Sequence, residues 1–129
     1  ALLIIMPACA MTGCSGSKEP VNKTSVDYTV VENADLPEEL KKLIESKKDK
    51  VMRLTYTTKD YTYVVAGYGT RETSGYSIKV NDVYTGDNAL YIDLNLIGPA
   101  AGEAVNEVDT YPVIVLKMER REESVVFKM

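Results

Sequence analysis

Few side chains in this 129-residue sequence could perform catalysis. Histidine is absent, which removes serine–histidine and cysteine–histidine nucleophilic systems, histidine-ligated zinc and the commonest general base. Asp82, Asp93 and Asp109 could pair as acid and base or bind calcium, but they form no compact acidic loop and fit scattered surface carboxylates better. The segment 67–69 (Gly-Tyr-Gly) would cradle a phosphate if a helix followed it, whereas the next residues predict a strand. We therefore expect a non-catalytic protein with no metal site and no cofactor.

The start of the sequence carries a different kind of chemistry. Residues 1–11 are uncharged and almost wholly apolar, with the length of a signal-peptide core and too few residues to span a bilayer. Residues 11–14 (MTGC) resemble the bacterial lipobox, although Met11 stands where leucine is usual. The resemblance implies that Cys14 receives diacylglycerol and that the chain is cut before it. A disulfide between Cys9 and Cys14, or a buried strand, is the alternative.

The sequence divides into three parts. We expect a truncated lipoprotein signal peptide over 1–13, a lipidated cysteine with a flexible tether over 14–27, and one domain over 28–129. Hydrophobic residues make up 45% and charged residues 26%, as in globular domains, and the net charge of −4 argues against nucleic acid as a partner. The expected location is the cell envelope, outside the cytoplasm, on a membrane to which the lipid on Cys14 holds the protein.

One amphipathic helix is predicted over Asp35–Lys48. Asp35 is the expected N-cap, and Glu38 three residues later would complete a capping box. The lysines of the segment alternate with glutamates, which favours a solvated outer face over a membrane-binding one. The apolar residues at helical spacing are Leu36, Leu40, Leu43 and Ile44.

From residue 51 onward the hydrophobic period changes to two, which predicts strands. A turn is predicted at Thr85–Asn88 from its Gly, Asp and Asn residues. The fold class is therefore α+β: one N-terminal amphipathic helix followed by five to six mostly antiparallel strands that form a sandwich- or barrel-like sheet. The expected strands are 51–57, 61–67, 76–81, 90–96, 113–118 and 124–129, with a short one at 28–32.

Two loops between predicted strands are candidates for binding. They are Gly67–Gly75 and Gly98–Thr110, and the second is long for a small domain. The chain has nine tyrosines and one phenylalanine, and tyrosine combines apolar area with a hydroxyl group for contacts. Half-buried strand positions would equally explain many of these tyrosines.

Four ordered blocks, at residues 36–45, 63–80, 98–112 and 113–118, resemble the C-terminal domain of PrcB-type proteins, accessory lipoproteins of a surface protease complex. The family's Thr-Gly-Gly-Tyr-Ser segment corresponds to residues 73–77, where Ser74 replaces a glycine. Glu72 stands at a usual proline, and Ala101-Gly102 at a usual Pro-Gly. The resemblance implies a domain that binds a protein partner, such as an exported protease, without catalysing a reaction.

The candidate partner-binding residues follow from the two loops and this resemblance. A weaker similarity to chagasin-like cysteine-protease inhibitors, at Thr73–Tyr76 and Tyr111–Pro112, implies a protease inhibitor as an alternative. A lipoprotein that binds a small molecule or a glycan on exposed tyrosine rings is a further alternative. The candidate partner-binding residues are Arg71, Glu72, Thr73, Ser74, Gly75, Tyr76, Tyr111 and Pro112.

Overall fold

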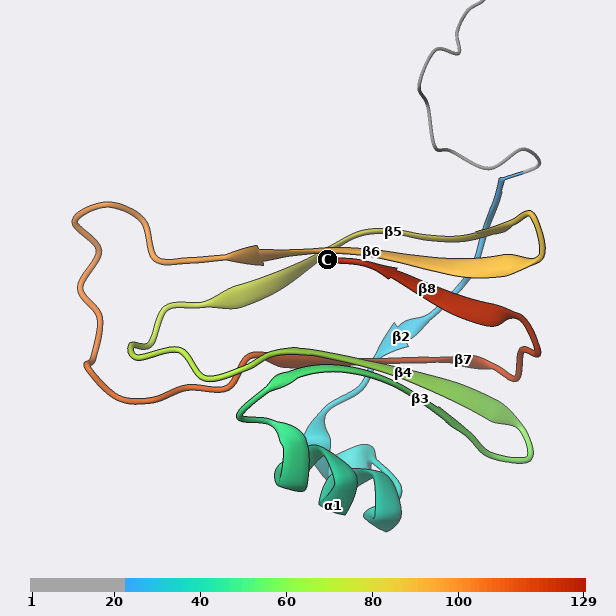
Figure 1. Cartoon of the computed structure of the whole chain (residues 1–129), viewed down its shortest axis with the longest axis horizontal. Helices are drawn as coiled ribbons and strands as arrows, with labels where there is room; N and C mark the ends of the chain where they lie inside the picture. Colours follow the sequence, from blue (N-terminus) through green and yellow to red (C-terminus); the bar gives the residue numbers. More distant parts are fainter. Residues whose placement is uncertain (1–22) are drawn as a thin grey trace, which may run out of the picture.

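The computed structural model describes residues 23–129 (Figure 1). The predicted signal peptide, the lipidated Cys14, the alternative Cys9–Cys14 disulfide and most of the predicted tether lie outside the described residues. The end of the predicted tether is described, and part of it is a strand: β1 (Thr24–Ser25) pairs antiparallel with β5, and the amide of Val26 donates to the carbonyl of Val83 at 3.0 Å. No helix within 23–129 is both long and apolar enough to cross a membrane.

The helix α1 spans Glu38–Lys47, so it begins later than the sequence pattern predicted. Asp35 is not its N-cap: it belongs to a short 3-10 helix, η2 (Asn33–Asp35), and α1 starts after Pro37 without a side-chain cap. The cause is Pro37, which disfavours helical angles at the residue before it, and Leu36 is accordingly extended with ψ 152°. The apolar face is nevertheless as predicted at Leu36, Leu40 and Ile44, which are buried, whereas Leu43 is exposed.

Four strands form a fully antiparallel sheet that lies against α1, here called sheet B. Its order is β2-β7-β4-β3. The β3–β4 hairpin closes over residues 58–60, where the amide of Thr58 donates to the carbonyl of Tyr61 at 2.8 Å. The bounds are β2 Thr29–Val30, β3 Val51–Thr57, β4 Tyr61–Tyr68 and β7 Val113–Glu119.

A second sheet, sheet A, has the order β1-β5-β6-β8. The β5–β6 hairpin turns at Asp87 and Asn88, whose φ angles of 51° and 67° are those that a tight two-residue hairpin turn requires. The last strand, β8, pairs parallel with β6, so sheet A is mixed rather than fully antiparallel. Only four residues join β7 to β8, so β8 must start at the end of the sandwich where β7 finishes. Strand β6 starts at that same end, so β6 and β8 run in the same direction. The bounds are β5 Ser77–Gly86, β6 Ala89–Ile97 and β8 Ser124–Lys128.

The molecule therefore has three layers, α1 on sheet B and sheet B on sheet A (Figure 1). The central strand β4 is buried on both faces: Val64 and Ala66 pack toward sheet A, and Tyr63 and Val65 toward α1. The α+β class is confirmed in this form, with two sheets that do not close into a barrel. Six of the eight described strands follow the helix, as predicted, and β2 lies within the predicted short strand at 28–32, whereas the two-residue strand β1 was not predicted.

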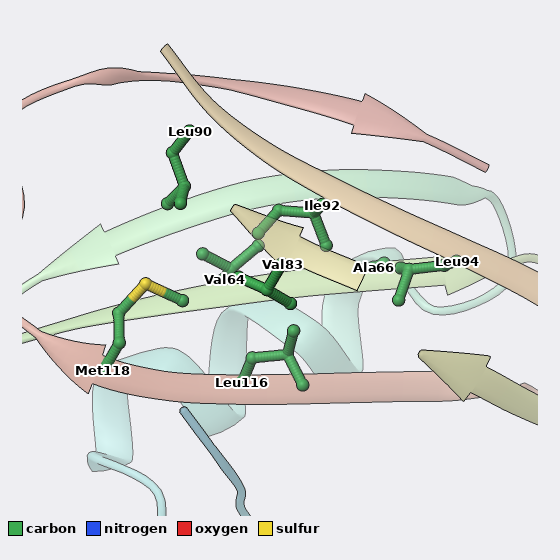
Figure 2. Packing of buried hydrophobic residues seen from close by; sticks show 8 residues of the cluster. All are labelled: Val64, Ala66, Val83, Leu90, Ile92, Leu94, Leu116 and Met118. Carbon is green, nitrogen blue, oxygen red and sulfur yellow. The ribbon is translucent and has the colours of Figure 1, made fainter. Parts of the chain in front are cut away.

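The core between the two sheets is aliphatic (Figure 2). Side chains from β4, β5, β6 and β7 meet there, and Leu90 and Ile92 are fully buried. Burial of this kind stabilises a fold by roughly 1.5–3 kcal/mol per large side chain. The rigid sandwich that results holds the loops at its two ends in fixed positions.

Candidate functional site

The two loops predicted to bind a partner lie together at one end of the sandwich (Figure 1). We call the segments 69–76 and 98–112 the loop end. Arg71 and Thr110 form an isolated antiparallel bridge, each amide donating to the other's carbonyl at 2.8 Å. Ser74 and Asn106 form a second pair: the Ser74 amide donates to the Asn106 carbonyl, and the Asn106 amide donates to Ser74 Oγ, both at 2.9 Å. Main-chain bonds thus fix one loop on the other.

Two predicted site residues, Thr73 and Gly75, help to fix the loops on each other rather than presenting a free side chain. The hydroxyl of Thr110 donates to the carbonyl of Thr73 at 2.8 Å, so Thr73 contributes its main chain. Gly75 has φ +96°, and a Cβ there would lie 3.1 Å from Pro99 and 3.2 Å from Val105. The loops therefore approach each other too closely for a larger residue at Gly75.

Tyr76 and Pro112 are half-buried structural residues at the start of β5 and β7. A Cβ on Gly98 would come within 3.2 Å of the Tyr76 ring, so this ring packs on the long loop. The carbonyl of Pro112 accepts from the amide of Tyr68 at 3.0 Å and extends the pairing of β4 with β7. Neither residue offers a fully exposed side chain to a partner.

Arg71 is a half-buried cation at the centre of the loop end. Its Nη2 donates to the carbonyl of Tyr68 at 3.2 Å, and its guanidinium carbon lies 5.7 Å from the centroid of the Tyr76 ring. Within residues 23–129 it forms no ion pair, and its buried Nε has no hydrogen-bond partner. The side chain thus connects the end of β4 to the start of β5.

The Tyr68 hydroxyl is also buried without a hydrogen-bond partner. Burial raises the pKa of the Tyr68 phenol above its ordinary value of 10.0, a nearby Asp93 raises it further, and Arg53 opposes the shift. Unsatisfied buried polar groups are few in folded proteins. Two of them, on Tyr68 and Arg71, lie at this end of the molecule.

The exposed part of the loop end is apolar and acidic. Val108 is 54% exposed and Tyr111 is 37% exposed, and the ammonium of Lys48 lies 4.7 Å from the Tyr111 ring centroid. The predicted site residue Glu72 is exposed, as are three acids of the long loop. These three are Glu103, Glu107 and Asp109.

A groove of about 300 Å³ adjoins Tyr111. Valines from β2 and β7 and the α1 residue Ile44 supply most of its apolar lining, and Glu45 and Lys48 lie at its rim. Sequence reasoning missed this groove and Val108. The lone valine between Glu107 and Asp109 was a signal for an exposed apolar residue, but nothing in the sequence brings α1 and β2 beside Tyr111.

The aspartates considered for catalysis do not converge on a site. Asp82 and Asp93 are opposite each other on β5 and β6, but Lys23 pairs with Asp82 at 2.7 Å and Asn81 donates to Asp93 at 3.3 Å. No group of three potential metal-ligating side chains occurs within residues 23–129. The Gly-Tyr-Gly segment at 67–69 leads through the loop end into strand β5 rather than into a helix, so it lacks the phosphate-binding context.

Comparison with protein families identifies a family that part of this chain matches. Residues 62–119 match the family model described as PrcB C-terminal. The match runs from the second residue of β4 to the end of β7 and includes every predicted partner-binding residue. Searches of curated proteins and of solved structures found no match. The resemblance to the PrcB C-terminal family is confirmed, and the weaker resemblance to chagasin-like inhibitors has no support in these comparisons.

Proposed function

Residues 62–119 of this chain match the PrcB C-terminal family, and from that premise we propose that the chain is a lipid-anchored, non-catalytic subunit that binds an exported protease through its loop end. The observation that carries the proposal is the pairing of the two loops. Five hydrogen bonds, three between main-chain groups and two that involve a hydroxyl group, fix them on each other, so little chain entropy is lost when a partner binds. Preorganised loops on a rigid sandwich are suited to protein recognition.

The exposed surface of the loop end has the composition of a protein interface. Val108 and Tyr111 are apolar contacts, and tyrosine is among the residues enriched in the centres of interfaces. The groove beside Tyr111 is large enough to accept an apolar side chain of the partner. The acidic side chains around these residues would form a polar rim.

The charge of the long loop predicts the charge of the partner's surface. The long loop carries three exposed acids and no basic residue, so a partner with a basic patch fits the loop end. Exposed charges separated by more than a Debye length, about 8 Å at 0.15 M salt, are largely screened. We therefore expect association to slow as salt rises.

The lipid on Cys14 would set the orientation. Cys14 precedes Lys23 by nine residues, which reach about 30 Å when fully extended. Strand β1, which follows Lys23, lies near the end of the sandwich opposite the loop end (Figure 1). An anchored domain would thus stay close to the membrane and direct the loop end away from it.

Recovery of partners from membranes tests the proposal. The full chain carrying Val108→Ser and Tyr111→Ala should recover far less of an exported protease than the wild type. Val126→Ser is the matched control, because Val126 is a 40% exposed valine on β8, away from the loop end. Unchanged recovery by the loop-end variant would contradict the proposal.

Mass spectrometry of the membrane-extracted protein tests the anchor separately. The expected N-terminus is a Cys14 that carries lipid. An unmodified, soluble protein that retains residues 1–13 would contradict lipid anchoring while leaving partner binding open to its own test.

The position of both loops at one end of a sandwich also favours a second candidate, inhibition of a protease by the loop end. A chagasin-like inhibitor would block cysteine proteases at nanomolar concentration, whereas an accessory subunit would bind its protease without blocking it. An inhibition assay on a panel of cysteine proteases separates the two. Absence of inhibition at micromolar protein would exclude the inhibitor among the enzymes tested.

A further inference from the structure

We propose that a hollow at the other end of sheet B, opposite the loop end, binds a neutral saccharide. The hollow measures about 340 Å³, within the size range of small-molecule sites. It is distinct from the proposed partner site. We call it the tyrosine hollow, and its functional groups belong to Asp27, Tyr28, Thr29, Tyr61, Lys117 and Glu119.

The hollow exists because the sheet face facing α1 changes character along its length. Beneath the helix this face is apolar, with Leu54, Val65 and Val115 in one cross-strand row. The next row on this face brings Tyr63 and Lys117 together, and the row after it pairs Tyr61 with Glu119. Strands β4 and β7 extend past α1 at this end (Figure 1). Tyr61 in the outer row is accordingly 41% exposed, whereas Tyr63, nearer the helix, is buried.

Two exposed tyrosine side chains, Tyr28 and Tyr61, line the hollow. Tyr61 is 41% exposed and Tyr28 is 38% exposed. The face of an aromatic ring is negative, and the C–H groups of one pyranose face carry partial positive charge, so a sugar ring packs well on tyrosine. Because both tyrosine rings are already exposed, a sugar could pack on them without any movement of the core.

Lys117 supplies hydrogen-bond donors. Its ammonium lies 4.0 Å from the ring centroid of Tyr61 and 5.9 Å from that of Tyr63, and it forms no ion pair within residues 23–129. Aromatic rings rather than a carboxylate thus hold the ammonium. Its three N–H groups remain available to ligand oxygens.

Two carboxylates in the hollow supply acceptors. Asp27 and Glu119 make no ion pair within the described part of the chain, and an ionised carboxylate accepts hydrogen bonds without donating any. With one ammonium they give the hollow a formal charge of −1, which disfavours an anionic ligand. Hydroxyl groups both donate and accept, and a neutral saccharide combines many hydroxyls with apolar ring faces. This chemistry matches the whole set of groups in the hollow.

A titration of the full chain followed by amide chemical shifts tests the proposal. The neutral probes are cellotetraose and tetraacetylchitotetraose, and tetragalacturonate is the charged probe. We expect at least one neutral probe to cause saturable shifts at residues 27–29, 61 and 117–119, with a Kd of about 0.1–5 mM. The charged probe should bind more weakly.

Variants assign the binding to named side chains. Tyr61→Leu and Lys117→Met should each raise the Kd at least about tenfold. Tyr111→Leu is the matched control, because Tyr111 is 37% exposed but lies at the loop end, and its Kd should equal that of the wild type. Dispersed amide spectra identify the variants that fold, and Tyr28→Leu replaces Tyr61→Leu if the latter does not.

Three results would overturn the proposal. They are an absence of saturable shifts with either neutral probe at 20 mM, binding of tetragalacturonate alone, and shifts that map to residues 98–112. Unchanged affinity in the Tyr61 and Lys117 variants would also overturn it. None of these results bears on capture of a protease by the loop end, because that test changes other residues.

Discussion

Substitution of Gly75 by alanine tests whether the two loops are as closely packed as the structure shows. Gly75 has φ +96°, a region that L-residues avoid, and an added Cβ would lie 3.1–3.3 Å from side-chain atoms of Pro99 and Val105. The backbone penalty for an L-residue in such a conformation is about 1–2 kcal/mol. Forced contacts in a packed region add about 1–3 kcal/mol.

Gly102→Ala is the matched control for this substitution. Gly102 lies in the same long loop with φ +82°, but nothing lies within 4 Å of the position that an added Cβ would take. Its replacement should therefore cost the backbone penalty alone, about 1 kcal/mol after the smaller entropy of the unfolded alanine chain is subtracted. We expect Gly75→Ala to lower the free energy of unfolding by about 2–4 kcal/mol.

Urea unfolding followed by circular dichroism measures both effects. With a slope of about 1–2 kcal/mol per molar urea, Gly75→Ala should move the midpoint about 0.5–3 M further than Gly102→Ala does. Equal losses for the two variants would refute the reasoning, because only the contacts with Pro99 and Val105 distinguish the two glycines.

Three further substitutions test other parts of the structure. Leu40→Ala should lower the free energy of unfolding by about 2–5 kcal/mol in urea unfolding, because Leu40 is fully buried between α1 and sheet B, whereas the exposed Leu43→Ala should cost much less; equal losses would contradict this packing. Tyr68→Phe removes a buried hydroxyl without a partner and should leave thermal stability unchanged or raise it by up to about 1 kcal/mol; a clear loss would mean that the hydroxyl is hydrogen-bonded. Arg121 lowers the pKa of the Glu123 carboxyl below its ordinary 4.5, so the pairing stabilises the fold above that pH and is lost as the pH falls through the folded pKa. Glu123→Gln should therefore cost up to about 1 kcal/mol at pH 7 and nothing at pH 2, and a loss independent of pH would refute the pairing.

Local patterns predicted most of the secondary structure because single residues decide it. The period-two alternation placed β3 at its observed bounds and β4 within one residue. The turn residues Asp87 and Asn88 placed the β5–β6 hairpin. The start of α1 was missed because the capping pattern at Asp35 competes with Pro37, and the constraint that proline imposes on Leu36 prevails.

The sheet arrangement depends on contacts far apart in the sequence and was predicted less well. Strand β1 pairs with residues 84–85, some sixty positions later, and its polar residues Thr24 and Ser25 resemble a tether. The parallel pairing of β8 follows from the short connection after β7 rather than from any residue in β8 itself. Strand β4 is buried on both faces, so the layer against which each of its faces packs can be assigned only when both neighbouring layers are known.

The sequence predicted where the candidate site lies, but not which of its side chains are exposed. Both loops were identified, and the structure places them together, but Thr73, Gly75 and Tyr76 hold the loops in place instead of presenting free side chains. Exposure is a property of the folded chain, so the sequence could not separate these residues from Glu72 and Tyr111. The groove beside Tyr111 combines three distant segments and left no local signal.

Site-specific photo-crosslinking in cells that produce this protein tests its central proposal most directly. A photoreactive phenylalanine analogue would replace Tyr111 at the loop end in one variant and Tyr61 at the opposite end in another. The proposal predicts that the Tyr111 variant crosslinks to an exported protease, identified by mass spectrometry, and that the Tyr61 variant does not. Crosslinking of the protease from Tyr61 alone, or from neither position, would contradict a partner-binding loop end.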